Sequence, residues 1–264
     1  MSTFIILTVL MISLEVSSGL TSIPSRIVNG TDAEIEEFPY AVSLRSSWQG
    51  SHRCGGSILN PLWVLTAAHC VQFITPQRIN IQYGVTNING SGPNVVNVSK
   101  IIIHPRYFPV NLYQNDIAIL RLVEPIKLGE FVQTVRLPKM LQQTEGNTSA
   151  TLIGWGLDKS GGKIQTHLQK VELKVFSKKE CSERHHELIH KTNICAGVEE
   201  GGKGQCSGDS GGPLIVNNTQ VGIVSWSRKP CTIAPYPGVF TEVSNYIEWI
   251  RNTIEDDLNT SDWN

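Results

Sequence analysis

Apolar and polar residues alternate along the chain in short segments rather than in long helical runs. Clusters of glycine, proline, asparagine and serine separate these segments, for example at Asn60-Pro61, residues 89–93 and residues 160–162. Short apolar runs between turn-forming residues are typical of β-strands. The predicted strands include residues 41–45, 56–59, 63–66, 117–120, 151–153 and 214–216. The pattern therefore predicts an all-β sandwich or barrel.

Two segments have helical spacing instead. Residues 177–189 begin with Ser177, and Glu180 follows three residues later, as in a capping box. Residues 246–254 place three isoleucines on one helical face. Residues 255–264 form an acidic, polar tail, which we expect to fray.

The start of the chain resembles a secretion signal. Residues 4–14 are almost entirely apolar, and small residues follow up to Gly19. A run of this length fits a signal-peptide core and is shorter than the roughly 20 residues that span a bilayer. A buried strand is the alternative. We expect a signal peptide at residues 1–19, a secreted and extracellular protein, and no membrane association.

Composition narrows the function classes. The 264 residues include 22 Lys and Arg against 23 Asp and Glu, a net charge of −1, so no basic surface for nucleic acid is predicted. Only 17% of residues are charged, while 23 glycines and 13 prolines favour turn-rich β structure.

The cysteines fit an oxidising compartment. They form an even set without a CxxC pair, which argues against a zinc finger or a thioredoxin-type site, and spacing alone allows fifteen pairings. The six are Cys54, Cys70, Cys181, Cys195, Cys206 and Cys231. Candidate N-glycosylation sites are Asn29, Asn89, Asn97, Asn147, Asn217 and Asn259.

The segment from His186 to His190 reads H-E-x-x-H, which on a helix offers two imidazoles to zinc with Glu187 as a base. It lies in a short segment between two cysteines, and no longer architecture supplies a third ligand. We therefore interpret it as a solvated turn and predict no metal site.

A second set of residues is more specific. Ser210 lies in the turn Gly-Asp-Ser-Gly-Gly-Pro at residues 208–213, where glycines let backbone N–H groups approach an oxyanion. A serine hydroxyl needs a base to become a nucleophile. His69 follows a predicted strand, and Asp116 begins another, where a half-buried carboxylate would pair with an imidazole N–H. The order His, Asp, Ser suggests nucleophilic catalysis.

With these motifs the chain resembles the trypsin/chymotrypsin family of serine endopeptidases, from Arg26 to about Ile254. The matching segments are residues 26–30, 54–57, 65–70, 116–120, 154–156, 194–197, 208–213, 225–226 and 237–240. The resemblance implies two six-stranded antiparallel β-barrels packed face to face, with a C-terminal helix. It places barrel one at about 27–137, barrel two at about 138–245 and the helix at 246–254, within a protease domain of residues 27–254.

The resemblance also assigns roles. It makes His69 the general base, Asp116 the residue that orients it, and Ser210 the nucleophile, with the N–H groups of Gly208 and Ser210 as the oxyanion hole. Ser225 would help to hold Asp116. The implied disulfides are Cys54–Cys70, Cys181–Cys195 and Cys206–Cys231.

Activation is implied in the same way. Cleavage after Arg26 would remove a propeptide, residues 20–26, and free the α-amino group of Ile27. In the family, a carboxylate at the position of Asp209 pairs with this buried ammonium, since a buried charge is costly without a partner. The precursor should then be inactive, and the activator should be a trypsin-like protease.

The specificity pocket departs from the trypsin pattern. Gly204 stands at the position of the pocket floor, where an Asp selects Lys or Arg, and Gly238 supplies no charge either. An uncharged pocket favours cleavage after large apolar residues, as in chymotrypsin. Gln205 and Ser227 would narrow the pocket, which makes an elastase-like preference for smaller residues the alternative. Trp226 and Ser225 complete the expected substrate-binding residues.

No cofactor is expected. Residues 84–97, where some relatives bind calcium, contain no acidic residue. The expected partners are protein or peptide substrates, the activating protease and protein protease inhibitors, and we expect a monomer. The alternatives are a catalytically silent binding protein on the same scaffold and, least favoured, the zinc peptidase.

Overall fold

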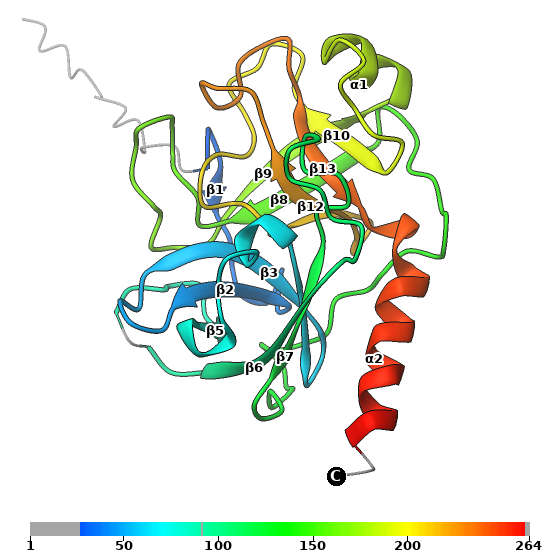
Figure 1. Cartoon of the computed structure of the whole chain (residues 1–264). Helices are drawn as coiled ribbons and strands as arrows, with labels where there is room; N and C mark the ends of the chain where they lie inside the picture. The colour runs from blue at the N-terminus through cyan, green and yellow to red at the C-terminus, as the bar shows by residue number, and fades with distance from the viewer. Residues whose placement is uncertain (1–26, 91, 262–264) are drawn as a thin grey trace, which may run out of the picture.

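Two antiparallel β-barrels and a C-terminal helix make up the computed structural model (Figure 1), which confirms the predicted fold class. The structure describes residues 27–90 and 92–261. The predicted signal peptide, the propeptide and Arg26 lie outside these residues. Among the helices described, none is long and apolar enough to cross a membrane.

The first barrel closes in the order β2-β3-β4-β7-β6-β5. Its strands are β2 (Ala41–Ser46), β3 (His52–Asn60), β4 (Trp63–Thr66), β5 (Ile79–Tyr83), β6 (Val95–Ile103) and β7 (Ala118–Leu122). Strands β2 and β4 are almost wholly buried, and Trp63, Leu65 and Leu120 fill the interior. Burying apolar side chains of this size is the main stabilising contribution to such a core.

The second barrel closes through the β8–β9 pairing, in the order β9-β10-β13-β12-β11-β8. Its strands are β8 (Ser149–Gly154), β9 (Gln169–Phe176), β10 (Asn193–Gly197), β11 (Pro213–Val216), β12 (Thr219–Trp226) and β13 (Gly238–Glu242). Leu152, Leu214 and Phe240 are fully buried in its core.

The start of the described chain lies with the second barrel, although we predicted barrel one to begin at residue 27. The short strand β1 (Thr31–Asp32) pairs with β9, and Ile27 is fully buried among the core residues of barrel two. The chain therefore crosses to barrel one only after β1.

Both predicted helices form, with different ends. Helix α1 (Lys178–Arg184) has the predicted Ser177–Glu180 capping box but stops five residues before the predicted end at residue 189. His186 and Glu187 adopt positive φ values of 56° and 64°, a left-handed conformation that cannot continue a helix.

Helix α2 (Ile247–Ser261) continues through most of the tail that we expected to fray. The physical reason is Asp257, whose carboxylate receives Lys100 Nζ and Arg121 Nε at 2.8 Å each. These contacts fasten the acidic part of the helix to β6 and β7 of barrel one.

Polar contacts cross from one barrel to the other. The N–H of Gly55 in β3 donates to Ser210 O at 2.8 Å, and Ser57 Oγ donates to Gln220 Oε1 in β12 at 2.6 Å. Trp155 Nε1 donates to Thr86 O at 2.8 Å. These contacts fix the relative position of the two barrels at the line where the predicted site residues meet.

Candidate active site

His69 and Asp116 form a direct pair, as predicted. His69 lies in the 3-10 helix η1 (Ala68–Cys70) that follows β4, and Asp116 lies two residues before β7. His69 Nδ1 and Asp116 Oδ2 are 2.7 Å apart, and the His69 backbone N–H donates to Asp116 Oδ1 at 2.9 Å. Because Nδ1 is the donor to a carboxylate, the neutral imidazole leaves Nε2 free to accept a proton.

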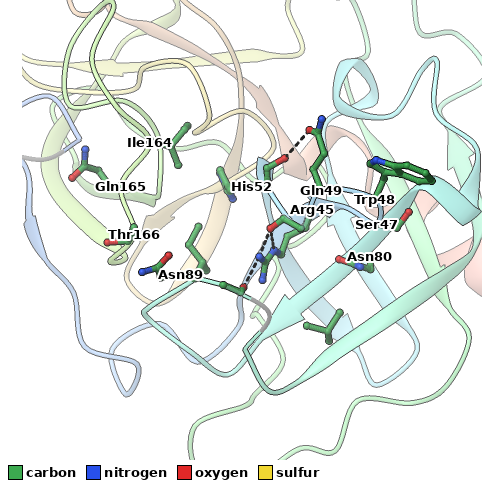
Figure 2. A pocket seen from close by; sticks show the side chains of 15 residues that line it. Arg45, Ser47, Trp48, Gln49, His52, Asn80, Asn89, Ile164, Gln165 and Thr166 are labelled. Carbon is green, nitrogen blue, oxygen red and sulfur yellow. Dashed lines mark hydrogen bonds between the residues drawn. The ribbon is translucent and has the colours of Figure 1, made fainter.

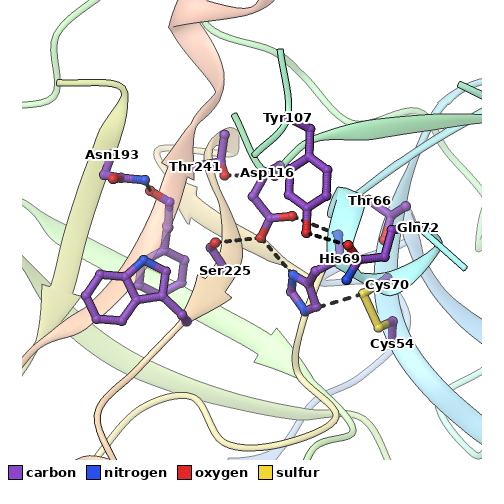
Figure 3. A network of polar contacts seen from close by, with 12 residues as sticks. Cys54, Thr66, His69, Cys70, Gln72, Tyr107, Asp116, Asn193, Ser225 and Thr241 are labelled. Carbon is purple, nitrogen blue, oxygen red and sulfur yellow. Dashed lines mark hydrogen bonds and ion pairs between the residues drawn. A yellow bond between two sulfur atoms is a disulfide. The ribbon is translucent and has the colours of Figure 1, made fainter. Parts of the chain in front are cut away.

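Barrel two holds Asp116 in place through its carboxylate and through its backbone carbonyl. Ser225 Oγ donates to Asp116 Oδ2 at 2.6 Å, and Thr241 Oγ1 donates to the Asp116 carbonyl at 2.8 Å (Figure 3). Asp116 is fully buried, so these donors, together with His69, compensate for lost hydration. Ser225 was predicted for this position; the contribution of Thr241 was not.

Ser210 shares one cleft with His69. This catalytic cleft has a volume of about 260 Å³, and its lining includes His69, Ser210, Gln205 and Trp226. The described residues form no hydrogen bond between Ser210 Oγ and His69 Nε2, a contact that is often long before substrate binds. The structure thus brings all three predicted catalytic side chains to one place.

Two backbone donors beside Ser210 are unpaired. In the turn, the N–H of Asp209 donates to Cys206 O and that of Gly211 to Val224 O, whereas the described residues accept nothing from the N–H groups of Gly208 and Ser210. Gly208 has φ +96°, a conformation that favours glycine. The turn therefore keeps two N–H groups free of acceptors among the described residues, which the predicted oxyanion hole requires.

Asp209 is buried directly behind this turn. Its Oδ1 accepts the Gly156 N–H and its Oδ2 the Cys206 N–H, both at 2.8 Å. Burial raises the pKa of Asp209 to about 7, although these two hydrogen bonds act in the other direction. Glycine is required at Gly154 and Gly156, where a Cβ would lie 2.3 Å from the Asp209 side chain.

His52 is a residue of the site that sequence reasoning missed. His52 Nε2 lies 2.9 Å from Gly208 O, and His52 Nδ1 lies 2.7 Å from Ser43 Oγ. A carbonyl only accepts, so Nε2 carries the proton and Nδ1 accepts from the serine hydroxyl. The ring therefore supports the oxyanion turn from barrel one. A lone histidine outside a motif gave no signal for this role.

This arrangement predicts a loss of stability at acidic pH. Burial lowers the pKa of His52 to about 4, below 6.5 for an unfolded histidine. Between these values the unfolded chain binds more protons, so the contribution of His52 is complete above pH 6.5 and is lost as the pH falls toward 4. We expect the free energy of unfolding in urea to fall by about 1–3 kcal/mol over this range for this reason alone.

The matched comparison is His52→Gln, which retains an N–H donor for Gly208 O but does not titrate. Other buried groups titrate equally in both proteins, so the difference between the two pH profiles isolates His52. Parallel profiles from pH 7 to pH 4 would contradict the assignment.

Gln205 partly fills the hollow that we predicted to be the specificity pocket. This buried side chain donates from Nε2 to Trp226 O at 2.7 Å, and its Oε1 has no hydrogen-bond partner among the described residues. A Cβ added at Gly238 would lie 2.8 Å from Gln205 Oε1, so the amide rests against that glycine. The space beyond, bordered by Gly204 and Ser227, is only about 10 Å³, barely enough for one water.

The H-E-x-x-H residues are not arranged for zinc. They follow the end of α1 rather than lying on it, and His190 Nε2 lies 2.8 Å from Asn111 O. Among the described residues, the one group with metal-ligand proximity is Cys54, His69 and Cys70, whose two sulfurs form a disulfide. The three disulfides of the structure are those implied by the family resemblance: Cys54–Cys70, Cys181–Cys195 and Cys206–Cys231.

All six glycosylation candidates are exposed. Exposure is necessary for N-glycosylation, and which of the six asparagines carry a glycan stays a prediction.

Comparison with known proteins agrees with this site. The family model described as Trypsin matches residues 27–250. Trypsin of Sus scrofa is 40% identical over 232 residues, which cover 87% of this chain and 96% of the relative. Trypsin II-P29 of Gallus gallus is 39% identical, covering 87% and 89%. Trypsin-1 of Astacus astacus is 39% identical over 237 residues, covering 85% and 98%.

Proposed function

The chain belongs to the trypsin family of serine proteases and is a serine endopeptidase, and we propose that it is secreted as a precursor activated by cleavage after Arg26. The observation that carries the catalytic assignment is the pair of buried Asp116 and partly exposed His69, which lines one cleft with Ser210, together with the unpaired N–H groups of Gly208 and Ser210. Protein or peptide chains are its substrates.

The proposed reaction follows from this geometry. His69 Nε2 accepts the proton of Ser210 as Oγ attacks the scissile carbonyl carbon, and Asp116 stabilises the imidazolium that forms. The carbonyl oxygen becomes an oxyanion held by the Gly208 and Ser210 N–H groups. His69 then gives its proton to the leaving amine. In the second half of the reaction His69 accepts a proton from water as the water attacks the acyl carbon, and it returns that proton to Ser210 Oγ as the acyl-enzyme breaks down.

Activation would act through Asp209. Its buried carboxylate has no ion pair among the described residues, and its raised pKa reflects the cost of ionising it there. The α-ammonium released on Ile27 is the cation that we propose as its partner. This pairing would stabilise the ionised carboxylate and with it the turn that carries Gly208.

We place the specificity among uncharged side chains of small or medium size, the second of the alternatives that the sequence left open. Among the described residues, no acid lines the pocket to pair with Lys or Arg, whose burial without a partner is costly. A large aromatic side chain would require Gln205 to leave its hydrogen bond with Trp226 O.

The test begins with a trypsin-like activator and N-terminal sequencing at Ile27. A panel of chromogenic peptides that differ only in the residue before the scissile bond is then assayed, together with a serine-reactive phosphonate. We expect turnover after activation only, and labelling of Ser210. An activated protein that neither reacts with the phosphonate nor hydrolyses any peptide would instead support the catalytically silent binding protein.

Replacing Gln205 by serine should change the size preference. The shorter side chain opens the space beyond the cleft, so kcat/KM for Phe or Tyr substrates should rise about 10- to 100-fold relative to Ala or Val substrates, as expected for a change of several methylene groups in an apolar pocket. The control is Gln142→Ser at an exposed position. An unchanged ratio would show that Gln205 does not limit the pocket.

A further inference from the structure

The oxyanion turn and the catalytic carboxylate are each supported by side chains that do not line the catalytic cleft. His52 supports the turn and borders a hollow of about 700 Å³, which Figure 2 shows. Asp116 is supported in another way, through the residue that precedes it in the chain. This residue, Asn115, lies outside the cleft lining, and so does Tyr246, which it contacts.

Both ends of the Asn115 amide are hydrogen-bonded. Its Nδ2 donates to Arg106 O at 2.6 Å, and its Oδ1 accepts from Tyr246 Oη at 2.9 Å. The backbone of Asn115 has φ 55°, a left-handed conformation that asparagine adopts more readily than most residues. Its carbonyl accepts the Ile117 N–H at 2.9 Å, which closes a three-residue turn centred on Asp116. The Asn115 contacts therefore fix the direction in which the chain enters this turn.

Tyr246 is held firmly in the interior. It directly precedes α2 and is only 3% exposed. Its ring packs edge-on against His104, with the ring centroids 5.3 Å apart, and the His104 backbone N–H donates to Ile117 O at 3.1 Å. Burial raises the pKa of Tyr246 to about 12, so at neutral pH the phenol keeps the proton that it donates to Asn115.

Helix α2 is itself fastened to barrel one (Figure 1). Near its end, the Asp257 carboxylate receives Lys100 Nζ and Arg121 Nε at 2.8 Å each. Tyr246 is fixed where this helix begins, and its hydroxyl reaches the residue before the catalytic carboxylate. The start of the helix is thus connected to the active site by one hydrogen bond to Asn115.

We propose that Tyr246 and Asn115 are positioning residues for the reaction, which hold the Asp116 carboxylate in line with His69. The proposal rests on the endopeptidase function proposed above and adds to it two residues outside the cleft. Without the Tyr246 hydroxyl, the Asn115 amide loses one of the two contacts that fix its backbone. The turn then relaxes, the carboxylate moves relative to His69 Nδ1, and the imidazolium that forms during the reaction is stabilised less.

The first test is Tyr246→Phe, which removes one hydroxyl and keeps the buried ring. We expect kcat of the activated enzyme to fall about 3- to 10-fold with KM nearly unchanged, the effect of losing one hydrogen bond that acts on the transition state. The loss should be partial because Ser225 and Thr241 still hold Asp116 from barrel two. Tyr40→Phe is the matched control, since Tyr40 is also buried but does not line the cleft, and it should retain the parent kcat.

The second test, Asn115→Gly, separates the side-chain contacts from the backbone conformation. Glycine adopts a left-handed φ without strain, so a loss of kcat in this variant assigns the role to the amide. Combining it with Tyr246→Phe should cause no further loss, because both substitutions act through the same amide. Asn94→Gly is the control: Asn94 is exposed, has φ 60° and does not line the cleft.

A readout that does not depend on turnover is the NMR resonance of the Nδ1 proton between His69 and Asp116. It is recorded in protein labelled with ¹⁵N-histidine and identified by its absence in His69→Ala. We expect this resonance to shift or broaden in Tyr246→Phe and in Asn115→Gly, and to match the parent in both control variants. The fraction of protein labelled by the serine-reactive phosphonate gives the concentration of folded enzyme for each kcat.

An unchanged kcat and an unchanged His69 resonance in Tyr246→Phe and Asn115→Gly would overturn the proposal. Equal losses in the control variants, or additive losses in the double variant, would overturn it as well. So would a fall in activity that a smaller phosphonate-labelled fraction explains entirely, because the contact would then serve stability alone. Failure of the parent protein to hydrolyse any peptide would count against the proposed function instead, while the His69 resonance would still test the contact with Asn115.

Discussion

Replacement of Ser210 by alanine is expected to lower kcat of the activated enzyme roughly 10⁴- to 10⁶-fold, because the acyl-enzyme cannot form without Oγ. The residual rate would come from the unpaired N–H groups of Gly208 and Ser210, which the substitution leaves in place. Chromogenic peptide hydrolysis by protein cleaved after Arg26 measures this effect.

The variant should fold normally, since the Ser210 hydroxyl has no hydrogen-bond partner among the described residues. Thermal unfolding should therefore match that of the parent protein. Ser99→Ala, which removes a hydroxyl of β6 that does not line the catalytic cleft, serves as the control and should retain full activity. Because Ser99 completes the glycosylation candidate at Asn97, the proteins are compared after deglycosylation. Substantial activity in Ser210→Ala would remove this residue from the reaction.

Replacement of Asp209 by asparagine is expected to separate cleavage from activation. An amide cannot neutralise the new Ile27 ammonium, and its NH₂ group would face the N–H of Gly156 or Cys206, each of which now donates to a carboxylate oxygen at 2.8 Å. If the oxyanion turn is displaced as a result, kcat should fall about 10²- to 10³-fold, the range found for loss of an oxyanion donor.

Sequencing should find Ile27 at the N-terminus of this variant, with little peptide hydrolysis and slow phosphonate labelling. Asp256→Asn, an exposed acid on α2, should behave as the parent does. Full activity in cleaved Asp209→Asn would mean that the oxyanion turn forms without the proposed ion pair.

The part of the site that could be predicted from the sequence is the part written in contiguous motifs. The local sequence is enough to recognise Ser210 among its glycines, His69 after its strand and Asp116 before its strand. That the three side chains lie close together was implied only by the family resemblance. The roles of His52 and Thr241 could not be predicted from the sequence. Neither residue lies in a recognisable motif, and each role depends on one hydrogen bond across the interface between the barrels.

The elements of the fold that could be predicted are likewise those marked by the local sequence. Strands predicted from short apolar runs, such as residues 63–66, agree with β4, because the turn-forming residues Asn60-Pro61 mark where the run begins. The end of α1 was missed because left-handed backbone at His186 and Glu187 leaves no sequence signature in non-glycine residues. The full length of α2 was missed because it depends on Asp257 meeting two cations from barrel one.

Asp116 comes from one barrel, and two of its hydrogen-bond donors come from the other: Ser225 donates to its carboxylate and Thr241 to its backbone carbonyl. Catalytic activity consequently depends on the interface between the two barrels and not on either barrel alone. Mild heat or pressure that loosened the interface between the barrels would abolish peptide hydrolysis, while the far-ultraviolet circular dichroism of both barrels remained native. The rate of peptide hydrolysis therefore reports sensitively on whether the two barrels remain packed together.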